Sequence, residues 1–119
     1  MTPLITTSNV TVMVKDLDRA IDFYTKVLGL SLVKRWENNY AQVRAPGVVI
    51  GLHPSDETFA NRDGLSIGFG VDDIDAAKKL LGENGVAYES HEGKSGRLLS
   101  FRDPDGTPLY FLQSRVGRW

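Results

Sequence analysis

The side chains best suited to acid–base chemistry in this 119-residue sequence are its two histidines and one of its four tyrosines. His53 ends a predicted strand, and Tyr110 lies inside the last predicted strand. An imidazole exchanges a proton near neutral pH, and a phenol donates or accepts a hydrogen bond. His91 stands beside Glu92 in a predicted loop. His53 and Tyr110 are therefore the candidate catalytic residues, and the alternative for each is a solvated or structural side chain.

A second set of side chains could hold a ligand without reacting with it. Guanidinium groups bind carboxylate or phosphate in bidentate fashion, and large rings stack on flat compounds. The alternative is that the arginines are solvated and that the rings pack in the core or in a dimer contact. Phe59 and Trp119 are further candidates for stacking. The predicted ligand-binding residues are Asn9, Trp36, Tyr40, Arg44, Gly51, His53, Ser66, Ser100, Arg102 and Tyr110.

Several classes of chemistry have no support in the sequence. No nucleophile–base pair, phosphate-binding loop or carboxylate dyad occurs at a recognisable spacing. The chain has no cysteine, which excludes disulfides and thiolate chemistry. A net charge of −1 without a basic run gives no electrostatic support for binding nucleic acid. No apolar stretch reaches the ~18 residues of a membrane span, and no signal-peptide pattern is present, so we expect a cytoplasmic protein with no membrane partner.

An internal repeat must position these residues. Residues 14–20, Val-Lys-Asp-Leu-Asp-Arg-Ala, correspond to residues 71–77, Val-Asp-Asp-Ile-Asp-Ala-Ala. A repeat of this length indicates two copies of one structural unit. We therefore predict one α+β domain over residues 1–119. It comprises repeat 1 at about 9–53, a linker at 54–64 and repeat 2 at about 65–113.

Each repeat predicts a strand, a helix and three more strands. Asp16 and Asp73 are placed as helix N-caps, and glycines follow each helix. Residues 91–96 form a predicted glycine-containing loop between two strands. The predicted strands are 9–14, 30–36, 40–45 and 48–53 in the first repeat, and 65–71, 86–90, 98–102 and 108–113 in the second; the predicted helices span 17–28 and 74–81.

Alternation along the predicted strands separates two faces of the sheet. The apolar face should pack on the helices, and the mixed face suits a small-molecule cavity. Glycines at 51, 68 and 70 support the cavity, because strand glycines often mark close approach by a ligand. The alternative is that the mixed face meets solvent. The apolar face holds Val10, Val12, Val14, Ala41, Val43, Val48, Ile50, Leu52, Ile67, Phe69, Val71, Leu99, Phe101, Leu109 and Phe111. The mixed face holds Asn9, Thr11, Met13, Tyr40, Gln42, Arg44, Val49, Gly51, His53, Ser66, Gly68, Gly70, Leu98, Ser100, Arg102, Tyr110 and Leu112.

Motifs in both repeats resemble the vicinal oxygen chelate superfamily. They are Asp-Leu-Asp-Arg-Ala at 16–20, Phe-Tyr at 23–24 with Val-Leu-Gly-Leu at 27–30, the equivalent segment 71–77, and Phe-Arg-Asp-Pro-Asp-Gly at 101–106. The superfamily contains glyoxalase I, bleomycin-resistance proteins, fosfomycin-resistance enzymes and extradiol dioxygenases. The resemblance implies paired βαβββ modules that form a cupped, mixed and mostly antiparallel sheet with helices on its outer face. It also implies a homodimer with cavities between modules.

The resemblance also locates the metal ligands of the family's enzymes. They would fall on Asn9, Gly51, Ser66 and Tyr110, where family enzymes carry His, Glu, His or Gln, and Glu. Amide, hydroxyl and phenol groups are poor substitutes for imidazole and carboxylate. We therefore expect no metal, no other cofactor, and no metal-dependent lyase, transferase or dioxygenase activity.

One further segment follows from the resemblance. Lys94, Ser95 and Arg97 resemble a basic loop that contacts an anionic substrate in some members. The alternative is an exposed hairpin loop.

Three functions remain open from the sequence. The leading hypothesis is a metal-free small-molecule binding protein similar to the bleomycin-resistance branch. It would sequester an antibiotic or toxin, expected to be aromatic, in a cleft of a homodimer. The rival is a metal-independent enzyme of lyase or isomerase type that uses His53 or Tyr110. The third is a dimeric interaction or regulatory module.

Overall fold

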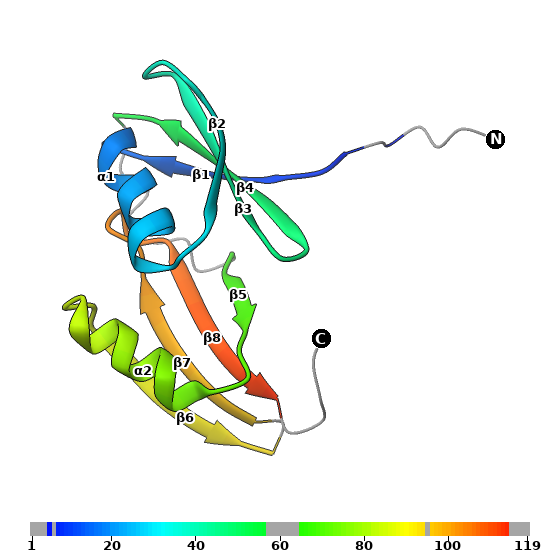
Figure 1. The fold of residues 1–119 in the computed structure, drawn as a ribbon, viewed down its shortest axis with the longest axis vertical. Coiled ribbons are helices and arrows are strands. Elements are labelled where there is room, and N and C mark those ends of the chain that lie inside the picture. The colour runs from blue at the N-terminus through cyan, green and yellow to red at the C-terminus, as the bar shows by residue number, and fades with distance from the viewer. Residues whose placement is uncertain (1–4, 6, 57–64, 95, 115–119) are drawn as a thin grey trace. The chain divides into compact units, whose positions relative to one another are not determined.

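The chain folds as two compact units, Met1–Thr58 and Phe59–Trp119, each with its own four-stranded sheet (Figure 1). The computed structural model describes residues 5, 7–56, 65–94 and 96–114. Each unit contains a strand, a helix and three further strands, so the predicted βαβββ order is confirmed. Phe59 and Trp119, predicted as stacking residues, and Ser95 of the predicted basic loop lie outside the described residues.

Unit 1 has a mixed sheet in the order β1-β4-β3-β2. β1 pairs with β4 in parallel, and the other two pairings are antiparallel. β2 is therefore an edge strand. The elements are β1 Val10–Val14, α1 Leu17–Asp22, the π-helix η1 Phe23–Val27, β2 Ser31–Trp36, β3 Tyr40–Ala45 and β4 Val48–Pro54.

Unit 2 repeats this topology in the order β5-β8-β7-β6. β5 pairs with β8 in parallel, and the other pairings are antiparallel. The mixed, mostly antiparallel architecture predicted from the sequence is confirmed. Within the described ranges, no helix is long and apolar enough to cross a membrane. The elements are β5 Ile67–Gly70, α2 Ile74–Glu83, β6 Tyr88–Gly93, β7 Gly96–Arg102 and β8 Pro108–Ser114.

Both predicted helix caps are present. The Asp16 carboxylate accepts a hydrogen bond from the backbone N–H of Arg19 at 3.1 Å. The Asp73 carboxylate accepts from the N–H groups of Asp75 and Ala76 at 3.1 and 3.2 Å. Each cap satisfies donors that the first helical turn leaves without partners.

The first helix departs from the prediction in its second half. Periodicity predicts one α-helix over 17–28, but η1 is a π-helix, with the N–H of Leu28 bonded to the carbonyl of Phe23 at 3.1 Å. Phe23 and Tyr24 are both buried, and their rings pack edge to face with centroids 5.4 Å apart. The sequence could not reveal the wider turn, because apolar residues three and four positions apart fit either helix.

The predicted apolar face forms the core of each unit. α1 contacts β3 and β4, and α2 contacts β7 and β8. Val10, Val48, Phe69 and Val71 are half-buried, and the other predicted members are buried, so strand parity predicted this face correctly. The buried members are Val12, Val14, Ala41, Val43, Ile50, Leu52, Ile67, Leu99, Phe101, Leu109 and Phe111.

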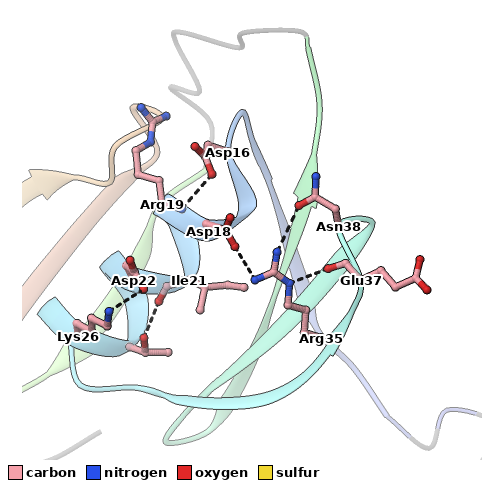
Figure 2. Close-up of polar contacts among 10 residues, drawn as sticks. Asp16, Asp18, Arg19, Ile21, Asp22, Lys26, Arg35, Glu37 and Asn38 are labelled. Carbon is pink, nitrogen blue, oxygen red and sulfur yellow. Dashed lines mark hydrogen bonds and ion pairs between the residues drawn. The ribbon is translucent and has the colours of Figure 1, made fainter.

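Arg35 ties the edge strand β2 to α1, as Figure 2 shows. Its Nη1 lies 2.6 Å from Oδ1 of Asp18, and its Nε donates to the carbonyl of Glu37 at 2.6 Å. Its Nη2 lies 3.3 Å from Oδ1 of Asn38. Arg35 thus points to the side of the sheet that α1 covers. Because neighbouring strand residues point to opposite faces, Lys34 and Trp36 point to the side away from α1.

Two predictions in the second repeat are wrong. The predicted loop at 91–96 is largely strand, because β6 continues through His91 to Gly93 and β7 begins at Gly96. Arg97 belongs to β7 rather than to a basic loop. Its Nη2 lies 3.1 Å from Oδ1 of Asp75, and this carboxylate raises the pKa of Arg97 above its ordinary value. The predicted strand 86–90 covers only the first half of β6, and the second half escaped prediction because it is a polar edge segment that lacks an apolar alternation.

Candidate functional site: the open sheet faces

The side of the unit 1 sheet opposite α1, here called the open face of unit 1, carries a row of rings. Trp36 pairs with Tyr40 across β2 and β3, and Met13 pairs with His53 across β1 and β4. The ring centroids of Trp36 and Tyr40 are 5.4 Å apart, and those of Tyr40 and His53 are 6.4 Å apart. The row places three predicted ligand-binding side chains side by side.

Tyr40 lies over Gly51, which is buried beneath it on β4. A Cβ at position 51 would overlap the Tyr40 hydroxyl and would lie 2.8 Å from Cζ of the ring. Only a glycine permits this approach. The sequence signalled the close approach correctly, but the group that approaches Gly51 is a side chain of the same sheet.

Two side-chain amides hold the Tyr40 hydroxyl. Nδ2 of Asn9 donates to it at 3.2 Å and also lies 3.2 Å from Oγ1 of Thr11. Nε2 of Gln42 donates to it at 3.5 Å. With two amides donating to its oxygen, the phenol has no described protein acceptor for its own hydrogen. The O–H of Tyr40 is therefore left as a donor to a ligand.

The charged side chains of this face are cationic. Nζ of Lys34 lies 4.9 Å from the centroid of the Trp36 ring. Arg44 is exposed on β3, where it pairs with Ser31 on one side and Val49 on the other. The sequence prediction included Arg44 but missed Lys34. Lys34 lies two residues before Trp36 on the same strand, so alternation along the strand could have placed both side chains on the same face.

The corresponding open face of unit 2 carries a polar row. Ser100 pairs with Glu89 on β6 and with Tyr110 on β8, which in turn pairs with Gly68 on β5. Nε2 of His91 lies 3.3 Å from Oγ of Ser100 and 3.7 Å from Oε2 of Glu89. This structure therefore brings an imidazole, a hydroxyl and a carboxylate together. The sequence prediction missed Glu89 and treated His91 as a loop residue.

The remaining predicted residues of unit 2 lie around this row. A Cβ at Gly68 would overlap the Tyr110 ring, so each unit has a tyrosine over a strand glycine. Ser66 is exposed, one residue before β5. Nη1 of Arg102 donates to the carbonyl of Gly106 at 2.6 Å, which anchors the guanidinium at the β7–β8 turn.

Comparison with known proteins decides the family. The family model of the Glyoxalase/Bleomycin resistance protein/Dioxygenase superfamily matches residues 7–111. The chain belongs to this superfamily. The probable lactoylglutathione lyase of Vibrio cholerae is 32% identical to it, over 86% of each chain.

Solved structures of the superfamily share the fold. A glyoxylase/bleomycin resistance protein/dioxygenase domain from a Frankia species is 28% identical, with a TM-score of 0.75 over 95% of this chain and all of that one. A genomically encoded fosfomycin resistance protein from Listeria monocytogenes has a TM-score of 0.82 at 18% identity, covering 96% of this chain and 97% of its own. At this low identity, the second likeness shows the fold alone.

The metal positions implied by the resemblance do not fit a divalent metal in this chain. Unit 1 supplies the amide of Asn9 and no side chain at Gly51, and the Tyr40 ring fills the space above that glycine. Unit 2 supplies the hydroxyl of Ser66 and the phenol of Tyr110. None of these groups is an imidazole or a carboxylate. Across the described ranges, no three His, Cys, Asp or Glu side chains are arranged to hold a metal ion.

Proposed function

We propose that this superfamily member binds a small molecule on the open face of unit 1 and that side chains, rather than a metal ion, hold the ligand. The observation that carries this proposal is the fixed position of Tyr40, supported from below by Gly51 and from the side by Asn9 and Gln42. A positioned ring with a free O–H donor provides both a stacking surface and a polar anchor. Small-molecule sites combine these two features.

Considered by itself, the polar row of unit 2 is a second candidate surface for ligand binding in this proposal. Its hydroxyl and phenol groups, Ser100 and Tyr110, can form hydrogen bonds, and Arg102 is anchored close to the same strands. The proposed biological role is sequestration of an antibiotic or toxin. Supporting it, the superfamily to which the chain belongs includes bleomycin resistance proteins. Association into a homodimer remains a prediction, which sedimentation velocity tests directly.

Calorimetric titration of chelator-treated protein with a panel of aromatic compounds tests the proposal. We expect at least one compound to bind without added metal, and Tyr40→Ala to abolish its binding. Tyr88→Ala is the matched control, because Tyr88 is a half-buried strand tyrosine of unit 2 that pairs with the buried Phe101. Binding that requires added metal, or that survives in Tyr40→Ala, would contradict the proposal.

A metal-independent enzyme is the second candidate function, and the contact between His91 and Ser100 favours it. An imidazole 3.3 Å from a hydroxyl, with Glu89 at 3.7 Å, is an arrangement that can move a proton. The name of the Vibrio cholerae relative supplies a substrate to test. Turnover of lactoylglutathione by chelator-treated protein, lost in His91→Ala and retained in His53→Ala, would support this candidate. Lack of turnover by the wild-type protein would exclude lactoylglutathione as the substrate of this metal-independent enzyme.

A further inference from the structure

The charges of unit 1 are sorted between the two sides of its sheet. The open face carries Lys34 and Arg44, and no Asp or Glu occupies a described strand position on that face. The acidic residues of α1, Asp18 and Asp22, lie on the helix side. Neither cation of the open face forms an ion pair with a described residue. Among the described residues of unit 1, the two cations of this face thus have no ionic partner.

The polar groups at the centre of this face act as donors. Asn9 and Gln42 donate to the Tyr40 oxygen, which leaves the phenol hydrogen to point at a ligand. Lys34 and Arg44 carry donors and no acceptor. A ligand that satisfies these groups must therefore present acceptors, and an anionic acceptor forms the stronger hydrogen bond.

The Lys34 ammonium and the Trp36 ring lie together on this face. Lys34 is two residues from Trp36 on β2, and its Nζ lies 4.9 Å from the centroid of the Trp36 ring. Trp36 is 38% exposed, so part of its ring is accessible for stacking. A planar compound that packs against Trp36 and Tyr40, whose rings are tilted by 39° to one another, can thus contact Lys34 with a substituent at its edge.

We infer that the open face of unit 1 selects planar aromatic anions, with an aromatic carboxylate as the simplest class. The aromatic system of the ligand packs against Trp36 and Tyr40, and its carboxylate accepts hydrogen bonds from the Tyr40 O–H and the Lys34 ammonium. This inference rests on the proposed small-molecule binding at the same face and adds the charge and shape of the ligand to it.

Three probes with one ring system test the inference by calorimetry: 2-naphthoate, 2-naphthamide and 2-naphthylmethylammonium. We expect 2-naphthoate to bind about tenfold more tightly than the neutral amide, and the cation to bind most weakly. Lys34→Met should reduce the preference for the anion about fivefold, as should high salt. Lys78→Met is the matched control, because Lys78 is an exposed lysine of α2 in unit 2, and it should leave all three affinities unchanged.

The outcomes separate this inference from the proposed function. Equal binding of the acid and the amide, or tighter binding of the cation, would overturn the inference while the proposed function stands. Failure of all three probes to bind would count against both. Binding of 2-naphthoate that is unaffected by Lys34→Met and by Trp36→Ala would place the anion elsewhere and would also overturn the inference.

Discussion

The phenol ring of Tyr40 occupies the space that a side chain at Gly51 would fill. The superfamily resemblance predicts a metal ligand at this position. In this chain the position is a glycine without a donor side chain, and the Tyr40 ring lies above it. It also supports Tyr40 at the centre of a face that is otherwise exposed or half-buried. The glycine that leaves position 51 without a metal ligand therefore also makes room for the ring that we propose binds the ligand.

Gly51→Ala should displace Tyr40 and disrupt ligand binding. We expect the free energy of unfolding to fall by about 1–3 kcal/mol, because the added methyl group overlaps the phenol. Urea denaturation and calorimetry measure the two effects. Gly82→Ala is the control: it lies in α2 with open space around its Cβ, and it should stabilise the protein by up to about 1 kcal/mol. Wild-type affinity in Gly51→Ala would contradict the role given to Tyr40.

Tyr40→Phe removes the donor while keeping the ring. The affinity for 2-naphthoate should fall about three- to tenfold, because one hydrogen bond to an anion is lost. The affinity for 2-naphthamide should fall less. Stability should change by less than about 1 kcal/mol, since Asn9 is exposed and can donate to water instead. An unchanged affinity for 2-naphthoate would show that the phenol hydrogen does not contact the ligand.

The two N-caps should contribute similarly to stability. Asp16→Ala and Asp73→Ala should each lower the free energy of unfolding by about 1 kcal/mol, because each removes an acceptor from the first turn of a helix. Asp22→Ala is the control, since the contact of the Asp22 side chain among the described residues is an exposed ion pair with Lys26 at 3.3 Å. Its effect should stay below about 0.5 kcal/mol. Equal losses from all three variants would refute the capping role.

The Arg35–Asp18 contact should couple β2 to α1 weakly. A double-mutant cycle with Arg35→Met and Asp18→Ala should give a coupling energy of about 0.5–1 kcal/mol, because the Asp18 side chain is largely exposed. The coupling should shrink at high salt. A coupling of zero would mean that Arg35 contributes only through its contacts with Glu37 and Asn38 in the β2–β3 turn and does not tie β2 to α1.

The sequence predicted the βαβββ topology, both helix caps and the two sheet faces, because each has a local signature. Alternation in β1, β3, β4, β5, β7 and β8 gave the core, and Asp16 and Asp73 marked the helix starts. The second half of the polar edge strand β6 has no such signature, so His91 was taken for a loop residue. The polar side chains Glu89 and His91, two residues apart, could have indicated that the strand continues and that both lie on one face.

The arrangement over Gly51 was beyond sequence reasoning for a different reason. Tyr40 on β3 reaches diagonally to Gly51 on the neighbouring strand β4, because Gly51 itself pairs with Gln42. The paired residue of Tyr40 on the other side is Trp36 of β2. The contact between Tyr40 and Gly51 depends on the rotamer of one ring and on the hydrogen bond from Asn9. Strand glycines indicated only that something comes close.

We propose that ligand binding on the open face of unit 1 needs no metal. Amide and indole NMR spectra of chelator-treated protein, recorded during titration with 2-naphthoate, give the sharpest test of this proposal. We predict shift changes concentrated at Trp36, Tyr40 and Gly51 that saturate without metal. Spectra that change only after a divalent metal is added, or whose changes fall only on unit 2, would contradict the claim.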